Sequence, residues 1–506
     1  MDPLGIFNDL LLGFQIAFSL QNLVFCFLGV TLGTLIGVLP GIGPVTGVAI
    51  LIPITFGLNA TAAIITMAGV YYGAMYGGST TSILINVPGE SSSVMTTLDG
   101  YQMAKQGRAG PALGMAAFSS FLAGTLAVVM LTFIAPPLAN VALAFGPPEY
   151  FALTFTGLTL VTSLSGESML KGIMSGVFGL IVACVGVDAI SGQERFTFGN
   201  IYLLDGLGFI GVAVGLFAVA EVLVNLEEPL KQVFVETKLS LRGLFPNLQD
   251  WKDSLGPIGR SSLLGFFIGV LPGAGATIAS FMSYAMEKKL SRHPERFGTG
   301  AIEGVAAPEG ANNAAAGGAM VPLLTLGIPG SGTTAVLLGA LLIHGLRPGP
   351  LLFQTNPDFV WGVIASMYIG NVLLLVLNLP LVGMWASILR VPYKILMPLI
   401  VTLSAVGVFA TDTNVFDMWV MFAFGIIGYL MRKLEFPAAP AVLGLVLGPL
   451  VERSLRQSLT ISHGDLSIFF TRPISAVLTI CALLSLCVPL ARALWRSRRK
   501  PAAVRP

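Results

Sequence analysis

One seven-residue phrase occurs twice in this chain and limits its possible folds more than any other feature. Residues 37–43 read GVLPGIG and residues 269–275 read GVLPGAG, 232 positions later. Proline and glycine interrupt α-helices, so each copy predicts a helix that breaks inside an apolar segment. At membrane depth such a break survives only where protein or a wet cavity satisfies its backbone groups. Paired breaks in two halves of one chain indicate the binding site of a transporter.

The composition indicates that the surrounding segments span a membrane. Of the 506 residues, 55% are hydrophobic and only 10% are charged, against about 25% in soluble domains. Repeated apolar runs of about 18 residues or more predict an all-α polytopic protein with about 10–12 transmembrane helices. The first lysine or arginine is Lys105, so the N-terminus lacks the basic flank of a cleaved signal peptide. The net charge of +2 is too small to indicate nucleic-acid binding.

Two further motifs recur in the same order and predict two repeats. NVPGESS at 86–92 matches GIPGSGT at 327–333, and GRAGP at 107–111 matches GLRPGP at 345–350. The offset grows only to about 241, as one duplication with small insertions would produce. We therefore predict a first transmembrane repeat in 1–226, a hydrophilic connection in 227–254, a second repeat in 255–450, and a final helix with a basic tail in 451–506.

Basic residues predict how the repeats lie in the membrane, because cytoplasmic loops collect lysine and arginine. Lys288, Lys289 and the tail from Arg492 to Lys500 are expected on the cytoplasmic side. The matching connection in the first half, 57–60, has no basic residue. This asymmetry favours inverted topology, with the two breaks entering from opposite faces and the C-terminus in the cytoplasm.

These motifs together resemble the large membrane subunit of the tripartite tricarboxylate transporters, the TctA family. The resemblance rests on both GVLPGxG copies and on YYGAMYGGS at 71–79, INVPGESS at 85–92 and APEGANNA at 307–314. It covers essentially the whole chain. It implies an ion-driven uptake system in the bacterial inner (plasma) membrane. It also implies two partners, a small four-helix membrane subunit and a periplasmic solute-binding protein that delivers an organic carboxylate.

The residues support carboxylate binding independently of that resemblance. In each half a Pro-Gly pair precedes a turn rich in hydroxyl groups that leads into an apolar helix, and helix N-termini bind carboxylates. Glycine would let backbone N–H groups approach the substrate. Valine at Gly89 or Gly330 is therefore expected to abolish uptake and leave folding intact. The candidate substrate-binding residues are Gly41, Gly43, Pro88, Gly89, Ser91, Ser92, Gly273, Gly275, Pro329, Gly330, Thr333 and Thr334. For each hydroxyl, the alternative is that it only caps its helix.

The coupling ion is predicted from amide groups. Asn312 and Asn313, with Asn86, offer side-chain oxygens that suit Na⁺, and the adjacent pair also offers N–H donors to a carboxylate. The structural alternative for this pair is hydrogen bonding across tightly packed helices. Glu309 is interpreted as a solvated interface residue. For Tyr72 and Tyr76, anchoring at the membrane boundary is favoured over the alternative that they line the site. Na⁺ is favoured over H⁺ because buried carboxylates that could carry protons are scarce in the sequence.

Enzyme chemistry has little support in the sequence. The three histidines form no HExxH or paired metal spacing, and the PGxG turn lacks the Gly-Lys-Ser/Thr ending of a P-loop. The four cysteines lie in apolar runs, where they are expected to pack rather than bind metal. We therefore expect no enzymatic activity, no metal and no cofactor other than the coupling ion. Two alternatives stay open: a passive anion channel, and a membrane-embedded enzyme acting on a lipid-linked substrate.

Overall fold

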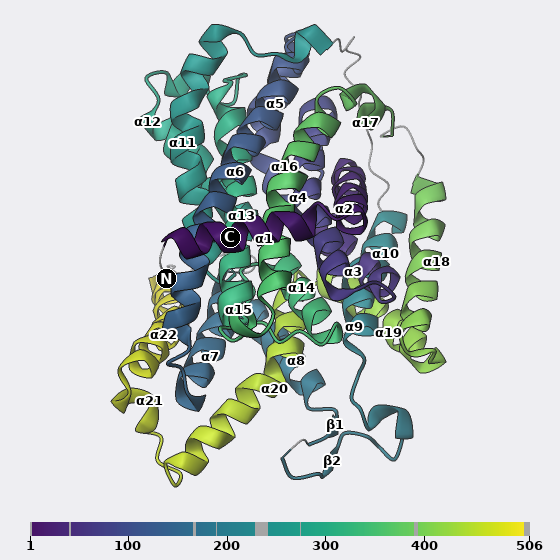
Figure 1. Cartoon of the computed structure of the whole chain (residues 1–506), viewed down its shortest axis with the longest axis vertical. Coiled ribbons are helices and arrows are strands. Elements are labelled where there is room, and N and C mark those ends of the chain that lie inside the picture. The colour runs from purple at the N-terminus through teal and green to yellow at the C-terminus, as the bar shows by residue number, and fades with distance from the viewer. Residues whose placement is uncertain are drawn as a thin grey trace, which may run out of the picture. The chain divides into compact units, whose positions relative to one another are not determined.

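The chain folds almost entirely into helices (Figure 1), which confirms the predicted all-α class. The computed structural model describes residues 3–39, 42–164, 168–188, 190–227, 241–273, 275–388 and 393–499. Within these ranges the strands are two-residue segments, β1 (Gly186–Val187) and β2 (Glu194–Arg195), which pair antiparallel.

The α-helices vary from one turn to more than nine turns in length. In chain order they are α1 (Pro3–Ala17), α2 (Leu20–Val38), α3 (Pro44–Thr55), α4 (Ala60–Ile85), α5 (Val94–Lys105), α6 (Ala109–Ala142), α7 (Pro147–Leu164), α8 (Met169–Ala183), α9 (Phe209–Val214), α10 (Ala220–Glu227), α11 (Leu248–Val270), α12 (Gly275–Leu290), α13 (Glu303–Leu326), α14 (Gly332–Ile343), α15 (Leu352–Thr355), α16 (Pro357–Asn378), α17 (Val382–Ile388), α18 (Tyr393–Asp412), α19 (Val415–Lys433), α20 (Ala438–Ile461), α21 (Ile468–Thr471) and α22 (Pro473–Arg499). A π-helical segment, Gly215–Val219, joins α9 to α10. Short 3₁₀ turns lie at Ser91–Ser93 (η1), Ile201–Leu203 (η2), Leu241–Leu244 (η4) and Pro294–Arg296 (η5).

Six helical segments in the described residues are long and apolar enough to cross a bilayer. They are Leu20–Val38, Ala109–Ala142, Phe209–Glu227, Pro357–Asn378, Val415–Lys433 and Ala438–Ile461. Shorter apolar helices, among them α3 and α14, accompany them. Exposed apolar side chains such as Phe133 and Val372 are ordinary on helices that face lipid. The chain is therefore a multi-pass membrane protein, and the total number of crossings stays a prediction.

The chain divides into two compact units. Unit 1 comprises 1–143 and 208–430, and unit 2 comprises 144–207 and 431–506. Each unit thus combines two separate parts of the sequence. The domains predicted from the sequence are defined by duplicated motifs, whereas these units are defined by their compactness. The predicted domain boundaries therefore stay a prediction.

Two helix pairs with matching contacts form the centre of unit 1. A Cβ added at Gly37 of α2 would lie 2.2 Å from the carbonyl oxygen of Ala74 in α4. A Cβ added at Gly269 of α11 would lie 2.2 Å from that of Ala315 in α13. Glycine therefore lets the backbones of each pair touch. The two glycines are 232 positions apart and the two alanines are 241 positions apart, which are the same offsets as those between the repeated sequence motifs. The inverted relation of the halves stays a prediction.

The two helices at the centre of these pairs, α4 and α13, are the most completely buried. Every residue from Ala62 to Ile85 and from Gly304 to Thr325 is buried. Figure 1 shows α13 in the middle of unit 1, where it contacts α11, α6, α12, α5 and α4. Neither helix is among the six apolar spans, because helices surrounded by protein pack through glycine, alanine and hydroxyl groups rather than through large apolar side chains.

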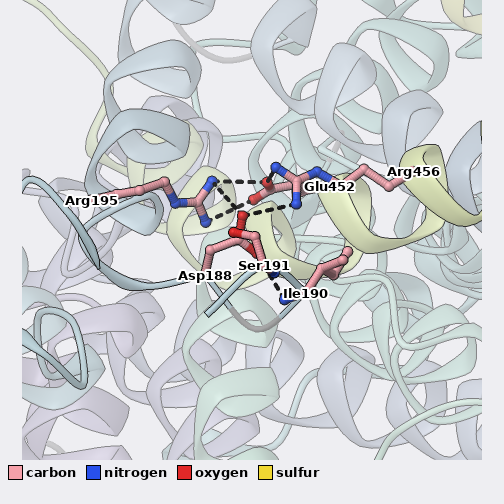
Figure 2. A network of polar contacts seen from close by, with 6 residues as sticks. All are labelled: Asp188, Ile190, Ser191, Arg195, Glu452 and Arg456. Carbon is pink, nitrogen blue, oxygen red and sulfur yellow. Dashed lines mark hydrogen bonds and ion pairs between the residues drawn. The ribbon is translucent and has the colours of Figure 1, made fainter. Parts of the chain in front are cut away.

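Unit 2 is built from α7, α8, α20 and α22, with a loop that contains β1 and β2. Helix α8 ends at Ala183, and the loop that follows it is polar. In Figure 2 the loop residues Asp188 and Arg195 point toward Glu452 and Arg456 of α20. Arg195 Nη1 lies 2.8 Å from Glu452 Oε1, and Arg456 Nη1 lies 2.8 Å from Asp188 Oδ2. These ion pairs fasten the loop to α20.

Candidate functional site

Both predicted helix breaks are present in unit 1. Helix α2 ends at Val38 and α3 begins at Pro44, while α11 ends at Val270 and α12 begins at Gly275. In the second break, Gly273 (φ 83°) and Gly275 (φ 60°) have left-handed backbone conformations, which glycine adopts without steric cost. Gly43 is the N-cap residue of α3. Gly41 lies outside the described residues.

The two Pro-Gly turns lead into helices that begin with the same type of capping motif. Glu90 caps η1, and Ser331 caps α14; in each turn the residue three positions on, Ser93 or Thr334, bonds back to the cap residue. These reciprocal bonds are capping boxes, which satisfy backbone N–H groups at a helix start. The capping alternative therefore accounts for Thr334. Ser92 donates from both its backbone N–H and its hydroxyl group to the Glu90 carboxylate.

Each turn packs directly against the break in its own half. A Cβ added at Gly89 would lie 2.1 Å from the Gly37 carbonyl oxygen, and one at Gly330 would lie 2.6 Å from the Gly269 carbonyl oxygen. The Gly273 N–H also donates to the Gly330 carbonyl oxygen at 3.1 Å. Valine at Gly89 or Gly330 would therefore collide with backbone. The expectation that folding would stay intact is wrong, because these glycines allow the turn to touch the helix.

The two halves also meet each other here. Tyr71 of α4 bonds Ser331 of the second turn with 3.2 Å between the hydroxyl oxygens. Ser91 of the first turn bonds Thr277 of α12 at 2.9 Å. The described parts of both breaks and both turns thus form one region, which we call the motif junction (residues 42–43, 88–93, 271–273, 275–277 and 329–334). The predicted substrate-binding residues other than Gly41 lie in it; whether they bind substrate stays a prediction.

A fully buried carboxylate lies beside the motif junction. Glu309 is 0% exposed, so its interpretation as a solvated interface residue is wrong. Its Oε2 accepts a hydrogen bond from Ser79 Oγ of α4 at 2.5 Å, and its Oε1 accepts one from Thr96 Oγ1 of α5. Asn312 Nδ2 lies 3.4 Å from the same carboxylate. Among the described residues no lysine, arginine or histidine pairs with it. An ionised carboxylate in such surroundings costs several kcal/mol, on the order of what buried ions in proteins cost.

The predicted ion-binding amides are only partly brought together. Asn312 and Asn313 are buried and adjacent, and Asn313 Nδ2 donates to Asn312 Oδ1 at 2.6 Å and to Ser120 Oγ at 2.8 Å. Hydrogen bonding across the helices, the alternative for this pair, therefore occurs. Asn86 is the left-handed C-cap residue of α4, and its side chain is exposed. It does not belong to the Glu309 cluster, which we define as Ser79, Thr96, Glu309 and Asn312.

Two tyrosines also differ from their interpretation as boundary anchors. Tyr72 and Tyr76 are 9% and 3% exposed inside unit 1. The Tyr76 hydroxyl donates to Asn371 Oδ1 at 2.7 Å. Buried tyrosine hydroxyl groups usually have a hydrogen-bond partner, and Tyr76 also lines a small cavity next to Ser79.

Sequence reasoning missed Glu90 and Glu309 as site residues, although a signal was available. Both acids stand in stretches of glycine, alanine and hydroxyl residues between apolar helices. An ionisable residue within a membrane bundle is by default a candidate for function. The missing information for Glu309 was its hydrogen-bond donors, which come from distant parts of the chain, whereas Glu90 bonds Ser92 in its own turn.

A cavity with charged lining lies in unit 2. It has a volume of about 320 Å³ and lies beside Asp188, Arg195 and Glu452. The backbone N–H of Ile190 and the Arg456 guanidinium hold the pKa of Asp188 well below its usual value. These charges are paired with one another (Figure 2), so the cavity offers little net charge to an anionic substrate. Among the described residues no group of three His, Cys, Asp or Glu side chains could hold a metal ion.

The fold and the motif junction define a class of protein: a polytopic helical membrane protein in which two broken helices and two capped turns meet in the interior. Residues 23–443 match the model of a protein family that is described as "Tripartite tricarboxylate transporter TctA family". The chain belongs to that family.

Similar proteins come from Agrobacterium vitis. One, described as an uncharacterized 52.8 kDa protein in the TAR-I ttuC' 3' region, is 49% identical over 498 residues, covering 98% of this chain and 99% of the relative. Another, described as an uncharacterized protein in the TAR-II ttuC' 3' region, is 48% identical over 226 residues, covering 44% of this chain and 93% of the relative. No solved structure matches the chain significantly.

Family membership establishes the general function. The chain is a large subunit of a transporter of this family, and it works with other subunits in a tripartite system. The family is one of transporters and not of enzymes. The substrate, the coupling ion and the particular partners are not fixed by membership.

Proposed function

We propose that this protein is the large transmembrane subunit of a secondary transporter that takes up an organic di- or tricarboxylate across the bacterial inner membrane, driven by a Na⁺ gradient. It receives the substrate from a periplasmic binding protein and works with a small four-helix membrane subunit. Its C-terminus lies in the cytoplasm.

One observation carries this proposal: both halves contribute a helix break and a capped helix start to the same junction. Ser91 reaches Thr277, and Tyr71 reaches Ser331, across the boundary between the halves. Helix starts present N–H groups and partial positive charge, which attract carboxylates without a buried lysine. A site between two halves can open alternately to either side when the halves move.

The proposed substrate contacts are the turns themselves. Ser91 is exposed at the first turn, and Thr333 follows the cap residue of α14 with its hydroxyl group outside the capping box. Asn312 and Asn313 are the proposed amide ligands of Na⁺, and Asn86 is a weaker candidate because it lies apart from them.

The test is uptake by liposomes that contain the large and small subunits. Labelled citrate, succinate and malate are supplied with or without the binding protein, and with external Na⁺ or with choline at constant pH. Uptake is expected only with the binding protein and with Na⁺. Equal uptake without the binding protein would overturn the partnership. Uptake in choline that follows the proton gradient would overturn Na⁺ coupling but would leave the assignment as a transporter intact.

A further inference from the structure

A carboxylate deep inside unit 1 has a hydrogen-bonding environment but no compensating charge. Glu309 is 0% exposed and accepts from Ser79 of α4 and Thr96 of α5. These donors are neutral, and no described cationic side chain pairs with the carboxylate. A carboxylate in this position is stable only when something positive neutralises it, because hydroxyl groups alone replace little of the lost hydration.

The neighbouring acids are held differently. Asp99 of α5 is also fully buried, but its Oδ1 accepts from the backbone N–H groups of Gly298, Gly300 and Ala301, and its Oδ2 accepts from the Tyr284 hydroxyl, each at 2.8 Å. Asp99 is therefore a structural anchor for the loop before α13. Glu90 accepts from Ser92 within its own turn and acts as a helix cap. Glu309 instead takes its hydroxyl donors from two other helices.

A small polar cavity lies beside Ser79, one of the hydroxyl donors to this carboxylate. Its volume is about 10 Å³, close to what a single water molecule requires. Ser79, which donates to Glu309, lines the cavity, as does Ser120, which accepts from Asn313. The cavity is thus about the size of one water molecule or a small cation, and it reaches Glu309 through Ser79.

Two further groups of this cavity have spare oxygen acceptors. Thr80 is 4% exposed, and its hydroxyl group makes no hydrogen bond to any described residue. Asn378 is 7% exposed; its amide nitrogen donates to the Leu374 carbonyl oxygen at 2.9 Å, but no described donor reaches its Oδ1. Both residues line the cavity, so their oxygens are available to a ligand or water inside it. Hydroxyl and amide oxygens are also the ligands that hard cations prefer.

We propose that Glu309 binds the cation whose gradient drives transport, with the hydroxyl groups of Ser79 and Thr96 and the amide of Asn312 completing the site and the adjoining cavity serving as its access. This inference rests on the proposed function and goes beyond its amide ligands by adding the charged one. The ligand is one monovalent cation, Na⁺ or a proton, which neutralises the carboxylate in the same way.

This placement also provides coupling. Ser79 and Thr96 belong to the first half of the chain, and Glu309 belongs to the second. Thr96 follows the first capped turn in α5, and Ser79 follows the stretch of α4 that reaches Ser331. Loading the cation therefore favours the arrangement in which the motif junction is assembled, because the site requires groups from both halves.

The test uses purified protein in lipid nanodiscs and needs no carboxylate substrate. Glu309→Gln keeps the size and most hydrogen bonds of the side chain but cannot bind a cation by charge. Glu303→Gln, on the same helix and outside the Glu309 cluster, is the matched control. Binding of radioactive sodium is measured by scintillation proximity. Protonation is measured by the infrared carbonyl band of a protonated carboxyl group during a pH titration without sodium.

If the cation is Na⁺, wild type and Glu303→Gln bind sodium saturably, and Glu309→Gln binds it at least about tenfold more weakly. If the cation is a proton, wild type and the control show a titrating carboxyl band that Glu309→Gln lacks. Wild-type behaviour of Glu309→Gln in both measurements overturns the proposal. So does a wild type that shows neither signal.

Uptake separates this proposal from the proposed function. With a carboxylate that wild type accumulates in the liposome assay, Glu309→Gln is expected to lose gradient-driven accumulation and to retain carboxylate exchange. Full accumulation by Glu309→Gln overturns the cation site and leaves the transporter intact. Conversely, cation binding that depends on Glu309, in a complex that moves no carboxylate, contradicts the proposed function alone.

Discussion

At the scale of single residues, adjacent threonines at the start of α14 have different surroundings. Thr334 Oγ1 accepts from the Ser331 N–H at 2.8 Å and belongs to the capping box. Thr333 is 3% exposed, and its hydroxyl group makes no hydrogen bond to any described residue. We therefore propose that Thr334 stabilises the helix and that Thr333 contacts the substrate.

Valine tests this division, since it replaces a threonine hydroxyl by a methyl group of similar size. Thr334→Val is expected to lower stability by about 1 kcal/mol, the usual effect of losing a cap. Thr333→Val is expected to leave stability unchanged and to lower uptake about tenfold, because a hydrogen bond to a charged group contributes about 1.5–3 kcal/mol. Thermal melting in detergent and uptake per folded complex measure the two effects. Wild-type uptake by Thr333→Val would mean that the turn is structural only.

Asp188 gives a pH-dependent prediction in unit 2. Folding lowers the pKa of Asp188, because the Ile190 N–H and the Arg456 guanidinium stabilise its ionised form. Such a group stabilises the fold above its unfolded pKa of about 3.9, and this contribution is lost as the pH falls through the lower folded value. At neutral pH, Asp188→Asn is expected to speed hydrogen exchange in the loop before η2 relative to wild type. Below pH of about 4 the difference should shrink. An equal difference at every pH would contradict the prediction.

At the scale of elements, glycine sets how closely the paired helices approach. Alanine at Gly37 or Gly269 would place a Cβ 2.2 Å from a backbone carbonyl oxygen of the partner helix, and overpacking of this kind costs about 1–3 kcal/mol. Each variant is expected to melt at a lower temperature than wild type. Gly259→Ala, on α11 with open space around it, is the control and should not lower the melting temperature. Equal melting temperatures for all three variants would contradict the prediction, because the paired helices would then separate at no cost in stability.

At the scale of the whole transport unit, the proposed function requires the contacts across the motif junction to open and close. The hydroxyl oxygens of Ser91 and Thr277 are 2.9 Å apart, close enough for two cysteines at these positions to form a disulfide. In a background without the four native cysteines, Ser91→Cys with Thr277→Cys is expected to lose uptake on oxidation and to regain it on reduction. Each single variant is a control whose uptake should not change on oxidation. Full uptake by the cross-linked double variant would mean that this contact stays closed during transport.

The sequence by itself determined the features that depend on local chemistry. Apolar runs and scarce charges fixed a helical membrane protein, and Pro40 and Pro272 with their neighbouring glycines fixed where helices stop. The recurrence of these motifs also indicated that breaks and turns belong together, as Gly89 with Gly37 and Gly330 with Gly269 now illustrate. Each inference needed only the residues within a few turns of the motif.

Tertiary structure alone decided which distant groups meet. Glu309 is bonded to Ser79, 230 positions away, and to Thr96, 213 positions away; its burial without a cationic partner could not be read from its neighbours in sequence. The same holds for Gly89, whose role in packing follows from a carbonyl oxygen in another helix. The reason is physical. Break and cap positions follow from backbone constraints within one segment, whereas the charge state and accessibility of a side chain depend on all the elements that surround it.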